Sequence, residues 1–324
     1  MKIALLINRE NFEKYSLWKD SGWELIHMGN DAPIEAKVIE TGAQVLVVDA
    51  ITRIGPNIIN NMPDLKLIHS QGVAYNGIDV EAARKAGIFV CNCAGANARP
   101  VAEQTMLLLL AILKGFRHNE DMIYQGRQME AKMSCFVEGP PELIGRKVGI
   151  VGYGAIGRIL AAMLKPFGCE LCYFDVMKVD PDKDDIEYLP LEDIFKQCDV
   201  VSLHTPVTPE TENMINGETL KLFKRGAILL NTARGELMDH NAVADALISG
   251  QLGGLGSDTL APEPFLLENP LISGLPDDVK RRVALSPHIA GITAGFFGRA
   301  YARVGGNCDA IIRGERPTCI VNKL

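Results

Sequence analysis

The sequence predicts an α/β fold of two doubly wound domains, each with a parallel β-sheet covered by helices on both faces. Three observations support this prediction. Short apolar runs alternate with helical segments along the chain, as expected where the strands of a parallel sheet are buried on both faces. One glycine-rich segment joins a strand to a helix, and a length of 324 residues suits two domains.

The first predicted domain begins at the first residues and ends near residue 97. Its four apolar strand patterns are Lys2–Ile7, Ala43–Val48, Leu65–His69 and Ile88–Asn92. Pro100 then opens a strongly apolar helix that ends near Lys114, because proline is favoured in the first turn of a helix. We expect this helix to connect the two domains.

The second predicted domain contains six further strands. They are Val148–Gly152, Leu171–Asp175, Asp199–His204, Ala227–Asn231, Gly254–Asp258 and Val283–Ser286. Ligands of open α/β sheets bind outside the carboxyl ends of the strands, so polar residues that directly follow these strands are the candidate functional residues.

The glycine-rich segment Lys147-Val-Gly-Ile-Val-Gly-Tyr-Gly-Ala-Ile-Gly-Arg158 predicts a dinucleotide site. Gly152 permits the tight turn, Gly154 lets the backbone approach a pyrophosphate, and Gly157 lets the helix pack against the strand. The start of the helix supplies free N–H groups and a positive dipole. A glycine triplet alone is a weak signal, since ordinary strand-to-helix turns also use glycine, but here a strand precedes it and a helix follows.

Asp175 lies 23 residues after Gly152, at the end of the next strand. A carboxylate there accepts hydrogen bonds from the ribose hydroxyls of the adenosine and repels a 2′-phosphate. NAD is therefore the predicted cofactor, while Lys178 leaves some use of NADP open.

Composition excludes several classes of protein. A net charge of −7 gives no basic surface for nucleic acid. The longest apolar run, Met106–Leu113, is far short of a membrane span, and the first residues open into a strand rather than a signal peptide. Eight cysteines do not form a disulfide framework in a chain of this size, and Cys169 and Cys172 point to opposite faces of a strand, so we expect no metal site. The predicted location is cytoplasmic.

Three polar residues after successive strands are the candidate catalytic residues: Arg234, Glu263 and His288. Each has an ordinary structural explanation, because Arg234 can pair on the surface, Glu263 can cap a turn between prolines, and His288 can be a hydrogen-bonded core residue. Their joint arrival at the carboxyl ends of strands in a dinucleotide domain favours a catalytic role.

With the glycine pattern, five segments resemble the D-isomer-specific 2-hydroxyacid dehydrogenase family in order and spacing. They are Val101–Thr105, His204–Thr211, Asn231–Gly235, Asp258–Pro264 and Ser286–Gly291. The resemblance covers nearly the whole chain. It implies a Rossmann NAD-binding domain, residues 99–288, inserted in a flavodoxin-like substrate domain of residues 1–98 and 289–324. It further implies that the final segment returns to the first domain and that the NAD-binding domain mediates a homodimer.

The resemblance also implies an activity and a role for each candidate. The enzyme would interconvert a D-2-hydroxy acid and its 2-keto acid with NAD. Arg234 would bind the substrate carboxylate, His288 would exchange the hydroxyl proton, and Glu263 would pair with His288, roles that suit a planar fork of donors and an imidazole near neutral pH. The backbone N–H groups of Val73 and Ala74 would help to hold the carboxylate. The implied cofactor-binding residues are Gly152, Gly154, Ala155, Ile156, Gly157, Asp175, His204, Thr205, Pro206, Thr211, Thr232, Ala233, Asp258 and Gly291.

The substrate is predicted by exclusion. The loop Gln71–Asp79 departs from the family pattern at Ala74, where glycine is common, and at Asn76-Gly77, where Asp-Asn is common. Phosphoglycerate dehydrogenases usually place an arginine where Asp49 stands, and a carboxylate repels phosphate. We expect a small substrate without phosphate, such as glyoxylate, hydroxypyruvate, pyruvate or a short branched 2-keto acid.

Other functions remain open. They are a D-3-phosphoglycerate dehydrogenase, for which Arg53 lies nearby, and a non-catalytic NAD(H)-responsive binding protein such as a corepressor. Oxidation of formate or phosphite is a narrower alternative, and glutamate at position 263 argues against the formate branch.

Overall fold

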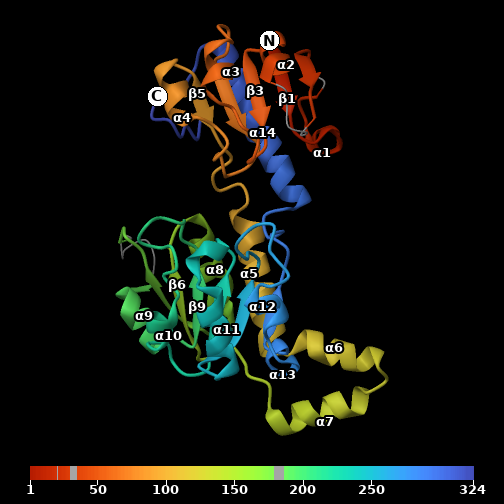
Figure 1. The fold of residues 1–324 in the computed structure, drawn as a ribbon, viewed down its shortest axis with the longest axis vertical. Coiled ribbons are helices and arrows are strands. Elements are labelled where there is room, and N and C mark those ends of the chain that lie inside the picture. Colours follow the sequence, from red (N-terminus) through yellow and green to blue (C-terminus); the bar gives the residue numbers. More distant parts are fainter. Residues whose placement is uncertain (20, 30–34, 179–185) are drawn as a thin grey trace. The chain divides into compact units, whose positions relative to one another are not determined.

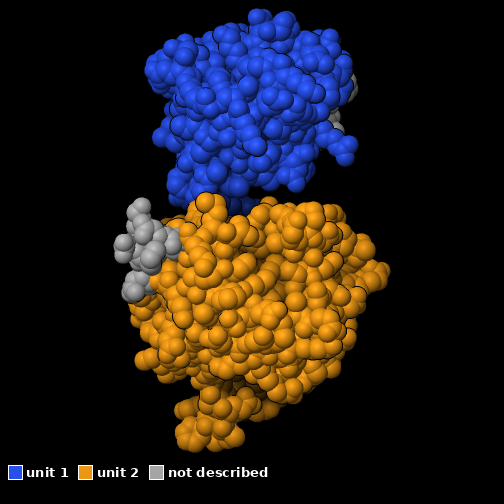
Figure 2. Space-filling model, turned by 90° about the vertical axis from the view of Figure 1, so that its left-hand side faces the viewer, with its two compact units in different colours: residues 1–97, 292–324 blue, residues 98–291 orange. Residues whose placement is uncertain are grey.

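The structure is a computed structural model that describes residues 1–19, 21–29, 35–178 and 186–324. The chain divides into two compact units, coloured separately in Figure 2. The first unit contains Met1–Asn97 and Ile292–Leu324, and the second contains Ala98–Gly291. The sequence predicted that the chain passes from one domain to the other after residue 98 and returns after residue 288.

The first unit has a parallel sheet of five strands in the order β2-β1-β3-β4-β5, which is the flavodoxin-like order (Figure 1). The strands are β1 Lys2–Leu6, β2 Glu24–His27, β3 Val45–Val48, β4 Leu67–Ser70 and β5 Phe89–Cys91. The helices are α1 Arg9–Tyr15, α2 Glu35–Glu40, α3 Pro56–Asn60, α4 Val80–Lys85 and α14 Ala294–Arg313. The fold class predicted for this part of the chain is confirmed.

Burial explains which strands of this sheet were predictable. All residues of β3 and β4 are buried, and such continuous apolar runs are typical of parallel strands covered on both faces. The prediction missed β2, an edge strand in which no residue is fully buried. The final segment does return to the first unit, since α14 packs on α1 and Ile320 pairs with Cys91 beyond the helix.

The second unit has a parallel sheet of seven strands in the order β12-β11-β10-β9-β6-β7-β8. Counted from the first strand of this unit, the order is the Rossmann order with one strand added. The strands are β6 Lys147–Val151, β7 Glu170–Phe174, β8 Glu187–Tyr188, β9 Val200–Leu203, β10 Ala227–Asn231, β11 Leu252–Ser257 and β12 Val283–Leu285. The short edge strand β8 was not predicted. The others lie within two residues of the predicted bounds.

Helices cover both faces of the second sheet. They are α5 Ala98–Leu113, α8 Ala155–Leu164, α9 Leu191–Gln197, α10 Gly217–Leu220, α11 His240–Ile248, α12 Pro270–Ser273 and α13 Asp277–Lys280. Two more, α6 Phe116–Tyr124 and α7 Gln128–Glu138, project from this unit as a helical hairpin (Figure 1). No helix in the described ranges is long and apolar enough to cross a membrane.

The eight cysteines are free thiols, and five of them are buried. Burial raises the pKa of Cys91, Cys93 and Cys308 to about 12, which keeps these thiols protonated and unreactive. The two thiols of the CxxC segment have different partners: the Cys169 thiol donates to the Leu143 carbonyl, whereas Cys172 Sγ lies 3.3 Å from Cys198 Sγ. Within the described ranges, no group of three or more potential ligands is arranged to hold a metal.

A buried histidine connects α14 to the interior strand β4. His69 Nδ1 lies 2.8 Å from the Ser70 carbonyl, and His69 Nε2 lies 2.9 Å from the side-chain amide nitrogen of Asn307. The Asn307 carbonyl oxygen already accepts hydrogen bonds from Thr318, so the amide faces His69 as a donor. His69 Nε2 must then accept, which requires a neutral imidazole, and burial lowers the pKa of His69 to about 4.

This lowered pKa predicts a loss of stability in acid. As the pH falls below about 6.5, His69 is protonated in the unfolded chain, whereas in the folded state it is protonated only near pH 4. The free energy of unfolding therefore falls by about 3 kcal/mol over this window through His69 alone. Trp18 and Trp23 both lie in the first unit, so tryptophan fluorescence during denaturant unfolding reports this unit.

His69→Gln should show a smaller loss of stability between pH 7 and pH 4.5 than the wild type, whatever its stability at pH 7. His118→Gln, in the second unit, is the matched control and should keep the wild-type difference. An equal pH dependence in His69→Gln and wild type would contradict the assignment.

Candidate active site

The glycine turn after β6 has the geometry that a dinucleotide requires. Gly152 has φ +94°, and a Cβ there would lie 2.6 Å from the backbone of His204. A Cβ at Gly157 would lie 2.4 Å from the Gly152 carbonyl oxygen, so only glycine lets α8 begin this close to the turn. Gly154 has open space around it. Within the described ranges no side chain caps α8 and the N–H groups of Ala155 and Ile156 have no acceptor, so they are available for a pyrophosphate.

Asp175 lies beside this turn. One of its carboxylate oxygens accepts a hydrogen bond of 2.7 Å from the Tyr153 N–H, and the other accepts one of 3.0 Å from the Met177 N–H. The carboxylate is thus fixed at the end of β7, where the ribose of an adenosine on the glycine turn would lie. Lys178, the residue that left NADP use open, lies with its ammonium 4.1 Å from the ring centre of Tyr188. These residues fit NAD.

The loop after β9 carries four of the predicted cofactor-binding residues, His204, Thr205, Pro206 and Thr211. The Thr211 hydroxyl donates to the Pro206 carbonyl and accepts from the Thr208 N–H, which closes the loop on itself. His204 Nε2 is 2.8 Å from the Ser202 hydroxyl, and burial lowers the pKa of His204 to about 4, so the ring is neutral. The backbone of His204 packs on Gly152, which places this loop against the glycine turn.

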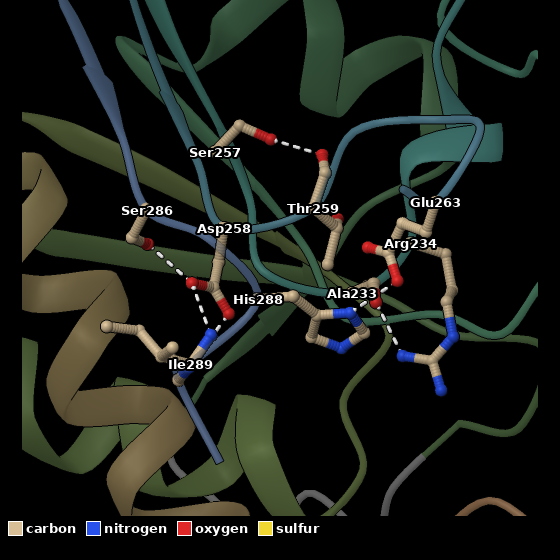
Figure 3. A network of polar contacts seen from close by, with 10 residues as sticks. Ala233, Arg234, Ser257, Asp258, Thr259, Glu263, Ser286, His288 and Ile289 are labelled. Atoms are coloured by element: carbon tan, nitrogen blue, oxygen red, sulfur yellow. Dashed lines mark hydrogen bonds and ion pairs between the residues drawn. The ribbon is translucent and has the colours of Figure 1, made fainter. Parts of the chain in front are cut away.

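Asp258 organises the loop that carries His288 (Figure 3). Three successive N–H groups donate to it: His288 N–H to its carbonyl, Ile289 N–H to Oδ1 and Ala290 N–H to Oδ2. His288 has φ +55°, an unusual conformation for histidine, and these bonds hold it there. The carboxylate that the sequence assigned to the cofactor is thus already engaged by the loop, and its contact with NAD remains a prediction.

His288 and Glu263 are in direct contact. His288 Nδ1 lies 2.7 Å from Glu263 Oε2, and each side chain is nearly half exposed. A carboxylate at Nδ1 fixes the tautomer in which Nδ1 carries a proton, which leaves Nε2 to exchange a proton with a ligand. Nε2 has no partner among the residues that the structure describes. This is the arrangement of a general acid and base with its orienting group.

Arg234 lies in the same cluster, and Figure 3 shows its side chain near His288 and Glu263. It follows β10 in extended conformation, and its guanidinium donates one hydrogen bond of 2.7 Å to the Ala233 carbonyl. No carboxylate in the described part of the chain pairs with it. An exposed guanidinium with unused donors can bind a carboxylate with two hydrogen bonds.

Two residues that the sequence prediction left without a role brace this cluster. Asn269 donates to Nδ1 of His240 and to the Ala261 carbonyl, while His240 Nε2 lies 3.2 Å from the Gly235 carbonyl. A Cβ at Gly235 would lie 2.3 Å from the Ala261 nitrogen, so the two backbones are in contact. The loops that carry Arg234 and Glu263 are therefore held together. The local sequence does not indicate that Asn269 and His240 are in contact, because 29 residues separate them.

In the first unit, the loop after β4 presents two free backbone donors. Asn92 donates to the Val73 carbonyl, and the Ser70 hydroxyl donates to the Ala74 carbonyl. The N–H groups of Val73 and Ala74 have no acceptor in the described ranges. Fixed carbonyls and free amides make a site for an anionic oxygen.

Gly77, one of the positions where this loop departs from the family pattern, has a steric basis. A Cβ at Gly77 would lie 2.2 Å from the Thr52 carbonyl oxygen, so glycine allows the loop after β3 to pack on the loop after β4. Asp49, which was expected to repel phosphate, uses Oδ1 to accept three hydrogen bonds from Ile51 and Thr52 within its own loop.

Together, the Rossmann strand order, the glycine turn and the carboxylate of Asp175 define a nicotinamide-dinucleotide-dependent oxidoreductase. Comparison with known proteins gives the family. Residues 106–290 match the model of the "D-isomer specific 2-hydroxyacid dehydrogenase, NAD binding domain". The chain belongs to the D-isomer-specific 2-hydroxyacid dehydrogenase family, which confirms the resemblance found in its motifs.

Relatives match over all or nearly all of the chain. The glyoxylate reductase of Korarchaeum cryptofilum is 34% identical over 328 residues, covering 100% of this chain and 97% of the relative. The hydroxypyruvate reductase of Thermotoga maritima is 32% identical and covers 93% of this chain and 90% of the relative. Among solved structures, D-2-hydroxyisocaproate dehydrogenase superposes with a TM-score of 0.85 at 28% identity, covering 99% of this chain and 100% of that one. The chain is an NAD-dependent oxidoreductase that interconverts 2-hydroxy acids and 2-keto acids.

Proposed function

We propose that this enzyme reduces a small 2-keto acid without phosphate, of the glyoxylate, hydroxypyruvate or pyruvate type, to the D-2-hydroxy acid. The observation that carries the proposal is the His288–Glu263 pair. Nε2 of His288 has no partner in the described ranges, and Arg234, drawn in the same cluster in Figure 3, pairs with no carboxylate there. NADH supplies the hydride when bound. Every other requirement of the reaction, binding of the carboxylate, polarisation of the carbonyl and delivery of a proton, then has a candidate residue.

Each candidate has a separate task in this proposal. Arg234 binds the substrate carboxylate and polarises the adjacent carbonyl, which fixes the carbon that accepts the hydride. His288 donates the proton from Nε2 to the developing hydroxyl, and Glu263 stabilises the imidazolium and orients the ring through Nδ1. The N–H groups of Val73 and Ala74 add donors for the carboxylate. In the oxidative direction His288 accepts the same proton.

The proposed cofactor contacts follow the glycine turn and its neighbouring loops. The pyrophosphate is held by the N–H groups at the start of α8, and the adenosine ribose by Asp175. The remaining residues proposed to contact NAD are His204, Thr205, Pro206, Thr211, Thr232, Ala233, Asp258 and Gly291.

Three points support a substrate without phosphate. The relatives above carry the names glyoxylate reductase and hydroxypyruvate reductase. Asp49 contributes a carboxylate to the loop after β3. Strand β4 ends at the neutral Ser70, whose hydroxyl forms hydrogen bonds with the loop that follows. Arg53 is the one basic residue in Asp49–Gly55. If Arg53 bound the phosphate of a substrate, the enzyme would be the alternative, a D-3-phosphoglycerate dehydrogenase.

The test is oxidation of NADH, followed by absorbance, with glyoxylate, hydroxypyruvate, pyruvate, a branched 2-keto acid and 3-phosphohydroxypyruvate, and with NADPH in parallel. We expect the highest kcat/KM for one of the first four. The highest value for the phosphorylated keto acid, or 3-phosphoglycerate as the best substrate of the reverse reaction, would contradict the proposal. Tight binding of NADH without turnover of any keto acid would favour a cofactor-responsive binding protein instead.

We also propose that the protein is a homodimer that uses the α6–α7 hairpin. This hairpin exposes a set of large apolar side chains, which a monomer would leave in water: Phe116, Ile123, Tyr124, Met129, Met133, Phe136 and Val137. A second copy of the chain is the proposed occupant, because the family resemblance implies dimerisation through this domain.

Phe136→Glu tests the dimer. Phe136 is 82% exposed on the hairpin, so a charge there should leave the fold intact and disfavour association with an apolar partner surface. Sedimentation equilibrium should show a dimer for wild type and a dissociation constant raised by about 100-fold or more for the variant. Leu17→Glu, at an equally exposed leucine of the first unit, is the matched control. A monomeric wild type, or a variant as dimeric as Leu17→Glu, would exclude this interface.

A cytoplasmic location completes the proposal. All eight cysteines are free thiols, which is the usual state in a reducing compartment.

A further inference from the structure

Helix α5 contacts two of the three loops that carry the candidate catalytic residues, those of His288 and Arg234, and it does so through two consecutive side chains. Gln104 Nε2 donates to the Ser286 hydroxyl at 3.0 Å, in the loop after β12. Thr105 Oγ1 lies 2.8 Å from Thr232 Oγ1, in the loop after β10. Consecutive residues of a helix point about 100° apart, so one helix can support two different loops.

The Gln104 contact continues to His288. The Ser286 hydroxyl accepts from Gln104 and donates its own proton to Asp258 Oδ1. Asp258 is buried and accepts the successive N–H groups of residues 288–290. A chain of hydrogen bonds therefore connects α5 to the unusual backbone conformation of His288, as Figure 3 shows for the part from Ser286 onward.

The Thr105 contact leads to Arg234. The Thr105 hydroxyl donates its only proton to the Val101 carbonyl at 2.8 Å, so Thr232 must be the donor in the hydrogen bond between the two hydroxyls. Both threonines are buried, and water is therefore excluded as a substitute partner. Within the same turn, the Asn231 amide donates to the Arg234 carbonyl, so a fixed Thr232 fixes the backbone that presents Arg234.

We propose that Gln104 and Thr105 are positioning residues for catalysis, Gln104 for His288 and Thr105 for Arg234. The roles of His288 and Arg234 themselves rest on the proposed function. Gln104 acts on proton transfer through His288, whereas Thr105 acts on binding of the substrate carboxylate through Arg234. The two substitutions should consequently differ in which kinetic constant they change.

The test compares Gln104→Leu and Thr105→Val with wild type, using the keto acid that wild type turns over best. Gln104→Leu should lower kcat about tenfold and leave KM for the keto acid within twofold, because a misplaced acid slows the proton transfer. Thr105→Val should raise KM for the keto acid about tenfold. Thr105→Ser keeps the hydroxyl and should restore the wild-type KM. Glu103→Gln, on the exposed face of the same helix, is the matched control.

Hydrogen exchange gives a readout that does not depend on activity. The amides of residues 288–290 should exchange about threefold faster or more in Gln104→Leu, and those of residues 231–234 in Thr105→Val, with each effect confined to its own loop. The inference would be overturned if both variants changed kcat and KM by the same factors. It would also be overturned if hydrogen exchange were unchanged in both loops. If wild type turns over no keto acid, the proposed function fails, and the exchange experiment alone still decides whether α5 holds the two loops.

Discussion

Replacement of His288 by glutamine should abolish most of the turnover while leaving binding of the cofactor intact. In the proposed mechanism Nε2 of His288 exchanges the proton with the substrate, since Nδ1 is engaged by Glu263 at 2.7 Å. Glutamine has a similar length and hydrogen-bonding capacity but no proton to give near neutral pH. General acid–base catalysis contributes about 10²- to 10⁴-fold, so kcat for keto-acid reduction should fall by that factor.

The measurement is kcat for the best keto acid, together with the dissociation constant of NADH from fluorescence titration. The dissociation constant of NADH should stay within about twofold of wild type, because in the proposed mechanism His288 acts on the substrate and not on the cofactor. His118→Gln, in the same unit, is the matched control and should keep wild-type kcat. A kcat for His288→Gln within tenfold of wild type would show that another group delivers the proton.

Glu263 should contribute through His288 rather than independently. After Glu263→Gln, addition of His288→Gln should lower kcat by much less than it does in wild type, because two residues that act as a unit do not give additive losses. Additive effects would separate their roles.

The parts of this fold that were predictable from sequence are those in which local pattern and burial agree. Strands β3, β4, β9 and β10 are buried along their whole length, and each had been predicted as an apolar run. The edge strands β2 and β8 were missed, since a strand with one neighbour and exposed residues has no continuous apolar pattern.

The candidate site likewise has a part that the sequence predicted and a part that it did not. Arg234, Glu263 and His288 were predicted because each follows a strand of a parallel sheet, and the structure places His288 against Glu263. The contacts that support them were not predicted, although the residues lie in the segments that resemble the family. Gln104 and Ser286 are 182 residues apart, and Thr105 and Thr232 are 127 apart, so nothing in the local sequence shows that these residues pair. Such contacts are set by how helices pack on the sheet, which a single sequence does not reveal.

Arg234→Lys should impair the enzyme severely even though the charge is kept. The guanidinium of Arg234 donates one hydrogen bond to the Ala233 carbonyl, and its other N–H groups, which have no partner in the described part of the chain, are the ones proposed to bind the substrate. A planar fork can hold a carboxylate with two parallel hydrogen bonds, whereas an ammonium is a point charge on a flexible chain and fixes no orientation. Loss of that geometry at the carbon that accepts hydride should lower kcat/KM by about 10²- to 10³-fold.

The experiment measures kcat/KM for the same keto acid in Arg234→Lys and in Arg281→Lys, an arginine of the same unit outside the cluster, which should behave as wild type. Arg234→Ala with added guanidinium ion provides a second arm, since a free guanidinium restores planar donors without the side chain and should recover part of the lost kcat/KM. Near-normal kcat/KM in Arg234→Lys would remove the positioning argument, because charge alone would then suffice. Recovery in Arg234→Ala with ammonium but not with guanidinium would lead to the same conclusion.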